Sequence, residues 1–219
     1  MTHEVLNQAP ALEGHDPLKL DLALREALVR EGASWAEEQV GSYGRLMASR
    51  EMLENGRLAN EFNPKLRTHD RFGNRVDEVE FHPSWHALMN ASVSHGVHTG
   101  PWSEPRPGAH VARAAKMLMA SECEFGHGCP MSMTYSAVPA LRQQPELAAE
   151  WEPRLLSRSY DPRLVPAAQK SGALFGMAMT EKQGGSDVRA NTTRAEPIGA
   201  RGPGQEYALT GHKWFCSAP

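Results

Sequence analysis

The sequence lacks any uninterrupted apolar run of membrane-spanning length, and its first residues have neither the basic start nor the apolar core of a secretory signal. It is also poor in cysteine, with three in 219 residues, at Cys123, Cys129 and Cys216. The first two do not have the Cys-x-x-Cys spacing of a zinc knuckle or a redox pair. We therefore expect a cytoplasmic protein with no membrane partner, reduced structural thiols and no metal site.

An excess of charge of one sign is also missing. The chain has 23 basic and 26 acidic residues, a net charge of -3, and no long run of like charge. This part of the protein therefore has no basic field to hold the phosphates of a nucleic acid. With 40% hydrophobic residues the chain is long enough to bury a core, as one large domain or one domain plus the beginning of another.

Helical periodicity fills most of the chain before residue 170. Asp16-Pro17 is typical of an N-cap followed by a proline in the first turn, Pro83 begins another helix in the same way, and Gly56 is a weak point. We expect an irregular excursion between Pro64 and His82. The expected helical segments are 16–32, 35–47, 52–59, 83–93, 109–125, 130–141 and 145–156.

The pattern changes from helix to strand near Lys170. Segments 173–180, 192–196 and 207–210 have the composition of strands, and a turn-rich stretch separates the last two. The fold class predicted is α+β, with an all-α helical domain over residues 1–170 and the beginning of a β-domain over residues 171–219.

A glycine-rich turn, Gly184-Gly185-Ser186-Asp187, follows the first expected strand. Without side chains at the two glycines, the backbone can approach a pyrophosphate closely, and exposed N–H groups and the Ser186 hydroxyl can act as donors. Such a tripeptide taken alone is most often an ordinary turn, so its neighbours decide its meaning.

The longer pattern Met179-Thr180-Glu181-x-x-Gly184-Gly185-Ser186-Asp187, followed by Gly211-x-Lys213-Trp214-Phe215-x-Ser217, resembles the first signature of the acyl-CoA dehydrogenase family. The sequence of this region is similar to that of the AidB-like branch of the family, which belongs to the adaptive response to DNA alkylation. The resemblance extends upstream over nearly the whole chain, through segments 56–60, 81–86, 111–115 and 129–134.

The resemblance implies an N-terminal helical domain, a middle antiparallel β-barrel domain and a C-terminal helical bundle, with FAD between the last two. We therefore expect an N-terminal fragment of a longer protein, which ends early in the β-domain. The expected cofactor-binding residues are Met177, Met179, Thr180, Gly184, Gly185, Ser186, Trp214, Phe215 and Ser217.

Several roles follow from the same resemblance. Thr180 would bind the pyrimidine edge of the flavin, Ser186 the pyrophosphate, and Ser217 the region near N5, with Phe215 packed on the ring. Hydrogen bonds there would stabilise the reduced flavin. The family takes its catalytic base from the C-terminal bundle, so no residue of this chain is expected to be catalytic, and Glu181 is expected to shape the loop.

Two functions fit this pattern. The first is dehydrogenation of an acyl-CoA thioester by hydride transfer to FAD; the second is a flavoprotein that protects or repairs alkylated double-stranded DNA through the missing C-terminal region. In both the protein would be a homo-oligomer, as the family forms homotetramers. A third alternative is an inert product with an incomplete fold.

Two other groups of residues have weaker signals. His82 and His86 lie at i, i+4 spacing, and Glu122, Glu124 and His127 are close in sequence, but neither set has the pattern of a known metal site. We expect His82 to be a neighbour of the helix cap before Pro83. Cys216 is expected to pack and not to react, since no second cysteine or basic activator is near it in sequence.

Overall fold

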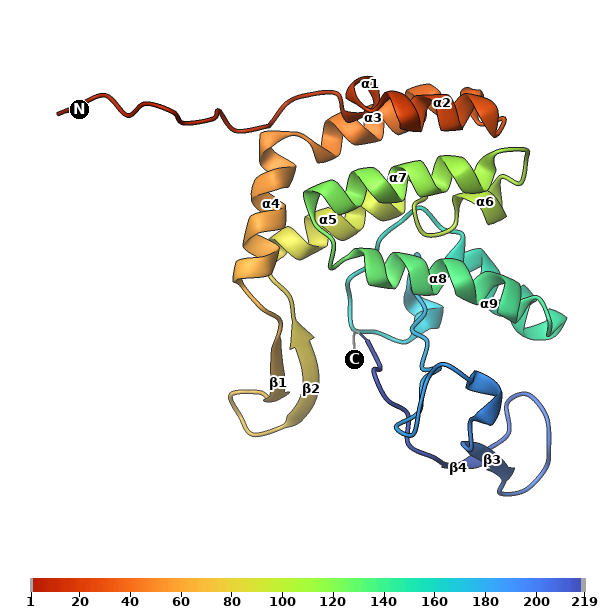
Figure 1. Ribbon diagram of the computed structural model, residues 1–219. Coiled ribbons are helices and arrows are strands. Elements are labelled where there is room, and N and C mark those ends of the chain that lie inside the picture. The colour runs from red at the N-terminus through yellow and green to blue at the C-terminus, as the bar shows by residue number, and fades with distance from the viewer. Residues whose placement is uncertain (1, 218–219) are drawn as a thin grey trace.

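The computed structural model describes residues 2–217 and consists of helices with two small antiparallel sheets (Figure 1). The helices are α1 (Pro17–Leu20), α2 (Leu22–Arg30), α3 (Glu37–Met47), α4 (Arg50–Glu61), α5 (Pro83–Ser94), α6 (Gly100–Ser103), α7 (Ala109–Cys123), α8 (Gly128–Leu141) and α9 (Pro145–Leu155). The strands are β1 (Lys65–His69), β2 (Arg75–Glu80), β3 (Arg194–Pro197) and β4 (Tyr207–Thr210).

The helices stack in layers, with α1 to α3 at one side, α5 and α7 in the middle, and α8 and α9 nearest the C-terminal segment (Figure 1). The contacts place α7 on α3 and α4 on α5. The core lies between these pairs and is built from fully buried side chains such as Tyr43, Met47, Leu88, Met119 and Met131. In the described part of the chain no helix is long and apolar enough to cross a membrane.

Side-chain caps explain where several helices begin. The Asp16 carboxylate accepts a hydrogen bond from the backbone of Lys19, as its position before Pro17 predicts. The single helix expected over 16–32 is divided at Asp21, whose carboxylate caps α2 through the amide of Leu24. The His82 ring accepts from the amide of Ser84 and caps α5, which confirms its expected place at the helix start.

Gly56 does not weaken a helix, contrary to the expectation. It lies inside α4, where a Cβ would come within 2.7 Å of the carbonyl oxygen of Cys123. The missing side chain therefore allows α4 to approach the end of α7 closely. Tertiary contact outweighs the lower helix propensity of glycine at this position.

The irregular excursion expected over 64–82 is wrong, because β1 and β2 form an antiparallel hairpin there. Lys65 pairs with Glu80 and Arg67 with Glu78, and the turn is closed by hydrogen bonds to the Asp70 carboxylate. The hairpin projects from the end of α4 away from the helices (Figure 1). The helical domain is therefore not purely α.

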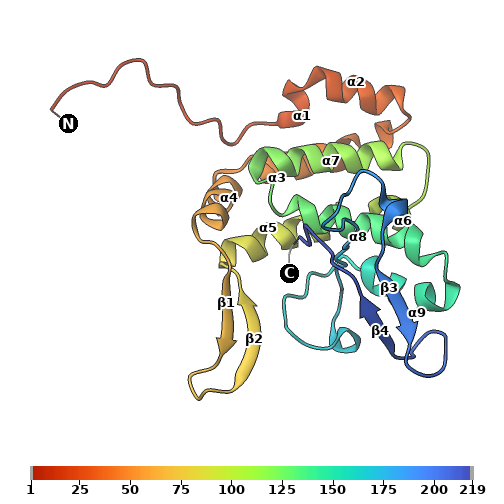
Figure 2. The ribbon, with the colours of Figure 1, turned by 60° about the horizontal axis from the view of Figure 1, so that its bottom comes forward.

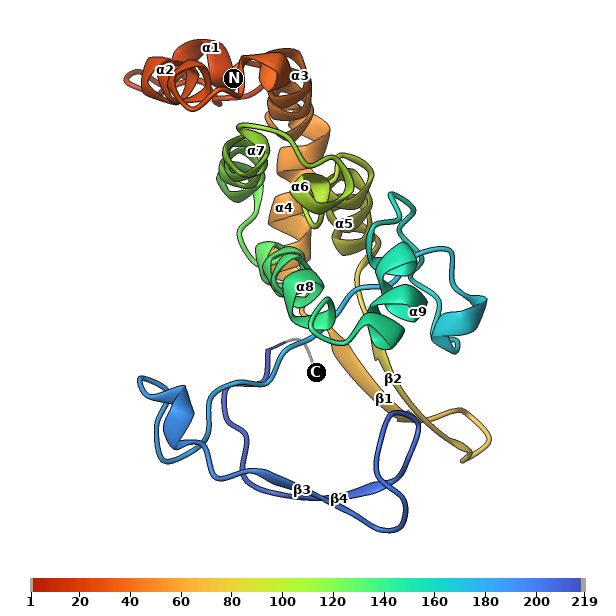
Figure 3. The ribbon, with the colours of Figure 1, turned by 90° about the vertical axis from the view of Figure 1, so that its right-hand side faces the viewer.

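The strands near the C-terminal end agree with the sequence only in part. Strand β4 is the expected strand 207–210, and it pairs with β3 from Arg194↔Thr210 to Pro197↔Tyr207. The expected strand 173–180 is not formed, because its amides bind helix α8: Phe175 donates to the Thr134 hydroxyl and Met177 to the sulfur of Met133. Figure 3 shows β3 and β4 apart from the helices, at the end of this extended segment, and Figure 2 shows the two strands side by side.

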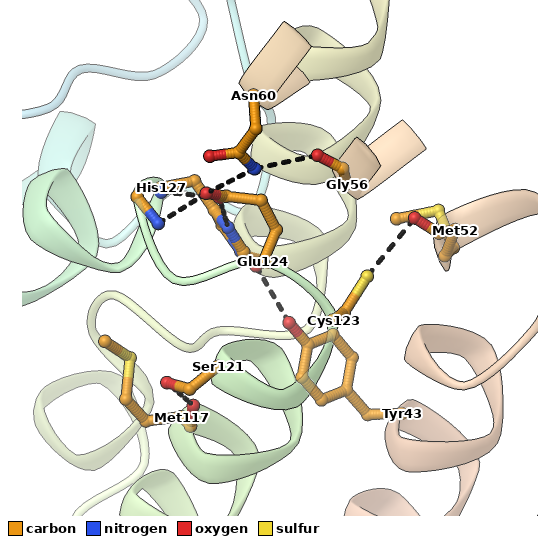
Figure 4. A network of polar contacts seen from close by, with 11 residues as sticks. Tyr43, Met52, Gly56, Asn60, Met117, Ser121, Cys123, Glu124 and His127 are labelled. Atoms are coloured by element: carbon orange, nitrogen blue, oxygen red, sulfur yellow. Dashed lines mark hydrogen bonds and ion pairs between the residues drawn. The ribbon is translucent and has the colours of Figure 1, made fainter. Parts of the chain in front are cut away.

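A buried polar network joins helices α3, α4 and α5 to the turn between α7 and α8. The His127 ring lies between Ser92, at 2.9 Å from Nε2, and the Glu124 carboxylate, at 2.8 Å from Nδ1. Tyr43 hydrogen-bonds Ser92, and Asn60 donates to Glu124 (Figure 4). The carboxylate therefore has ring, side-chain amide and backbone donors. In the sequence only the proximity of Glu124 and His127 indicated this arrangement.

This network predicts acid sensitivity. Burial acts to raise the pKa of Glu124, but hydrogen bonds from His127 and Gly126 prevail and lower it from 4.5 to about 2. Because the folded-state pKa is below the unfolded value, about 3 kcal/mol of stabilisation is present above pH 4.5 and is lost as the pH falls toward 2. Urea unfolding measured across this pH range should show that Glu124→Gln loses less unfolding free energy than the wild type.

The matched control is Glu122→Gln, since Glu122 is exposed and lies two residues before Glu124. Its unfolding free energy should follow the pH profile of the wild type. Parallel profiles for Glu124→Gln and the wild type would contradict the role assigned to the buried carboxylate.

Candidate flavin site

The two segments that carry the flavin signature lie against each other. The amide of Trp214 donates to the carbonyl of Thr180 at 2.9 Å, and the amide of Lys182 donates to His212 at 3.0 Å. Glu181 and Lys213 form an antiparallel bridge between these two bonds. Residues about thirty positions apart in sequence are thus joined through their backbones, as the sequence pattern requires of one site.

The Glu181 side chain holds this junction together. It is 1% exposed, and its carboxylate accepts from the amide of Thr192 at 2.7 Å, the amide of Thr193 at 2.9 Å and Gln183 at 2.6 Å. Lys213 forms an ion pair with it at 3.1 Å. Hydrogen bonds from Thr193 and Thr192 hold the pKa of Glu181 below its usual range, so the group is ionised. The expectation that Glu181 shapes the loop is confirmed.

The carboxylate also explains why β3 starts late. A strand was expected from residue 192, but the amides of Thr192 and Thr193 point to Glu181 and are not free for a ladder. Strand β3 therefore begins at Arg194.

Lys213 and Asn191 are site residues that the sequence analysis did not select. The Lys213 ammonium donates to the carbonyl of Met179 at 3.3 Å, and the Asn191 amide donates to the same oxygen at 2.8 Å. They fix the backbone beside Met179 and leave its side chain exposed. The signal for Lys213 was its place within the second half of the signature, where a lysine precedes two aromatic residues.

The two glycines of the turn have different surroundings. The turn is closed by hydrogen bonds between Glu181 and Gly184 in both directions, at 3.0 and 3.3 Å. A Cβ on Gly185 would come within 2.9 Å of the Thr180 side chain, whereas a Cβ on Gly184 would meet no atom within 4 Å. Gly185 is therefore required by packing, and Gly184 leaves open space at the exposed side of the turn, next to the exposed Ser186.

The aromatic end of the second segment is exposed and irregular. Trp214 is 40% and Phe215 81% exposed, and the Lys182 ammonium lies 4.2 Å from the Trp214 ring. Phe215 has a φ of 54°, in the left-handed region, so the alternation of a strand ends there. Over residues 214–217 the strand expected to present Phe215 and Ser217 is not formed. Cys216 is exposed, so its expected packing role is wrong.

A cavity of about 290 Å³, lined by apolar residues together with the charged Asp161 and Lys170, lies beside the start of the first segment. Trp85 and Met89 of α5 and Met133 of α8 line it, and Phe175 and Gly176 close it just before Met177. The cavity is therefore adjacent along the chain to the residues expected to bind the flavin.

These features fit a flavin. Exposed Met177, Met179, Trp214 and Phe215 offer apolar and aromatic surface for a planar ring, and Gly184 leaves room for close approach of an anionic group to the backbone. By contrast, the histidines do not converge, since His86 hydrogen-bonds Tyr160 while His82 caps α5. Over residues 2–217 no three histidine, cysteine or acidic side chains cluster as metal ligands do.

Comparison with known families decides the identity of the chain. The family model of the adaptive response protein AidB N-terminal domain matches residues 7–162. The chain belongs to the AidB family.

Curated relatives agree with this membership. The AidB-family chain is 47% identical, over its whole length, to the Escherichia coli (strain K12) protein named "Putative acyl-CoA dehydrogenase AidB". It is 31% identical over 93% of its length to acyl-CoA dehydrogenase family member 11 of Caenorhabditis elegans. It spans 40% of the first relative and 33% of the second.

Solved structures confirm the predicted fold class. The structure of Caenorhabditis elegans ACDH-11 in complex with C11-CoA matches with a TM-score of 0.73 and 27% identity, covering 98% of this chain and 36% of that one. Bd2924 in its apo form matches with a TM-score of 0.72 at 24% identity over 95% of this chain and 41% of that one, which shows the fold alone. The AidB-family chain thus has the fold of the part of these proteins that it covers.

Proposed function

We propose that this chain is part of an FAD-dependent, acyl-CoA dehydrogenase-like oxidoreductase of AidB type. The observation that carries the proposal is the Glu181 junction, which joins the two signature segments and leaves Met179, Trp214 and Gly184 open beside it. An FAD bound here would accept a hydride from the substrate. The protein would bind and orient the two reactants.

Roles for individual residues follow from their places. The backbone and hydroxyl of Thr180 would bind the pyrimidine edge of the ring, and Ser186 with Gly184 and Gly185 would bind the pyrophosphate. Trp214 and Phe215 would pack on the ring, and Ser217 would donate near N5. No residue of this chain is proposed as the base that removes the substrate's α-proton.

An acyl-CoA is the proposed substrate. The ACDH-11 structure is of a complex with C11-CoA, and the cavity lined by Trp85, Met89 and Met133 offers this chain an apolar space next to Phe175. Burial of apolar surface would stabilise an acyl group there. The proposal extends to a cytoplasmic homo-oligomer, which the family resemblance supports.

The test is titration of the full-length protein, loaded with FAD, with a series of acyl-CoA thioesters. Bleaching of the oxidised flavin absorbance by at least one of them is the expected result. Absence of bleaching across the series would reject the dehydrogenase, and salt-dependent retardation of duplex DNA would then favour the second function, a flavoprotein acting on alkylated DNA.

Two glycine variants separate flavin binding from folding. Gly184→Ala should weaken FAD binding at least about tenfold, because its methyl group occupies the open side of the turn, while the free energy of unfolding of the apoprotein changes by less than about 0.5 kcal/mol. Gly185→Ala should weaken FAD binding and also destabilise the apoprotein, because its Cβ meets Thr180. Unchanged FAD affinity in Gly184→Ala would exclude the turn from the site.

A further inference from the structure

Three cations surround a small cavity between α3, α6 and α7, away from the candidate flavin site. Arg113 and Lys116 of α7 line it together with Arg158, which follows α9. The cavity has a volume of about 20 Å³, which is room for one occupant the size of a water molecule. No residue of the flavin signature lines it.

Lys116 is almost fully buried, at 8% exposure. Its ammonium donates to the carbonyl of His95 at 3.0 Å and to Gln39 at 3.4 Å. An ammonium has three N–H donors, so one remains for another acceptor. Burial, and then the charge of Arg158, lower the pKa of Lys116 to about 8, which agrees with a surplus of positive charge around it.

Arg113 also has an unused donor. Its Nε donates to the carbonyl of Val97 at 2.9 Å, and its guanidinium lies 4.0 Å from the ring of Tyr135. Its Nη2 is buried without a hydrogen-bond partner among the described residues. Stacking on Tyr135 engages the face of the guanidinium, whereas the N–H groups lie in its plane, so the aromatic contact does not satisfy them. A guanidinium remains protonated, so this donor needs an acceptor.

The carboxylates near the cavity do not balance these charges. Of the described residues that line it, Glu104 alone is acidic. Glu104 is already bound to Arg158 at 2.8 Å and to Arg106 at 3.6 Å. The cavity therefore has a net positive lining, and two of its lining residues, Lys116 and Arg113, have N–H donors without a partner among the described residues.

We propose that this cavity binds a monatomic anion of the halide class, with chloride as its occupant. The positive surplus favours an anion over water, and the small volume favours a monatomic ion over a phosphate or a carboxylate. A wider depression of about 390 Å³ shares Gln39, Glu104, Lys116 and Arg158 with the cavity. It is also lined by Glu38, which is paired with Arg45. The anion links α7 to Arg158, at the start of the loop that leads to the flavin segment.

The direct test is diffraction from crystals of the full-length protein grown or soaked in sodium bromide. An anomalous peak between Arg113 and Lys116 is the expected result. In solution, replacing gluconate by chloride at constant ionic strength should raise the unfolding midpoint, in a saturable way, by about 2–4 °C at a concentration tenfold above the dissociation constant.

Arg113→Gln should abolish this chloride dependence, while Arg25→Gln, which removes an exposed cation paired with Glu37, should retain it. If Arg113→Gln does not fold, the bromide experiment on the wild type still shows whether the cavity binds a halide. Absence of an anomalous peak, or equal midpoints in chloride and gluconate, would show that the cavity holds water only. None of these readouts depends on flavin or acyl-CoA binding.

Discussion

Replacing Glu181 by glutamine is expected to weaken FAD binding at least about tenfold, and to loosen the junction between the two signature segments. In the wild type one ionised carboxylate accepts from Thr192, Thr193 and Gln183 and pairs with Lys213. Glutamine keeps the shape of the side chain but loses its charge. Its amide nitrogen is a donor, so it cannot accept the hydrogen bonds that the replaced carboxylate oxygen accepts. Lys213 then loses its ionic partner, and its hold on the carbonyl of Met179 weakens.

Flavin fluorescence quenching measures the affinity, and proteolysis or amide exchange over residues 178–215 measures the order of the junction. Both should change in Glu181→Gln. The control is Glu196→Gln, on the exposed strand β3, which should change neither. Wild-type affinity together with wild-type protection in Glu181→Gln would mean that the carboxylate does not organise the site.

The second large effect is expected in the helical part, where Gly108→Ala should lower the free energy of unfolding by about 3 kcal/mol. Gly108 is the N-cap of α7 and has a φ of 75°, which disfavours any residue with a Cβ. A Cβ there would also lie 2.6 Å from the amide nitrogen of Ala33, a backbone atom that cannot move alone. The methyl group would push α7 away from the turn after α2.

Gly73→Ala provides the matched control. Gly73 has a φ of 87° in the hairpin turn, and a Cβ would meet nothing within 4 Å. Gly73→Ala should therefore lower the free energy of unfolding by about 1 kcal/mol, which is the cost of the left-handed backbone conformation alone. Equal losses in urea unfolding for the two variants would show that the close approach of Ala33 adds nothing.

Helices were predicted well because their signals are local. Asp16-Pro17 and Pro83 start helices where the sequence predicts, and a capping residue and a proline act within one turn regardless of the rest of the chain. The hairpin β1–β2 was missed because all but one of its strand residues are exposed and they carry no apolar alternation, so that only the turn at Asp70 and Gly73 indicated it.

The sequence predicted which residues belong to the site better than it predicted how they are arranged. The signature selected Thr180 and Trp214, and the structure joins them by a backbone hydrogen bond. The strand expected before Thr180 failed because side chains of α8 take its amides, which depends on residues forty positions away. The domain boundary near residue 170 and the flavin contacts themselves stay predictions.

The sequence by itself determined the family, the helix starts and the residues of the two signature segments, since these are written in residue types at fixed short spacings. Only the tertiary structure decided that Glu181 is a buried anchor and that Glu124 and His127 share a network with Ser92. It also decided that an Arg113 donor has no partner among the described residues. The reason is physical. Burial and hydrogen bonding between charged groups depend on distances across the fold, and segments far apart in sequence set these distances only when the core packs.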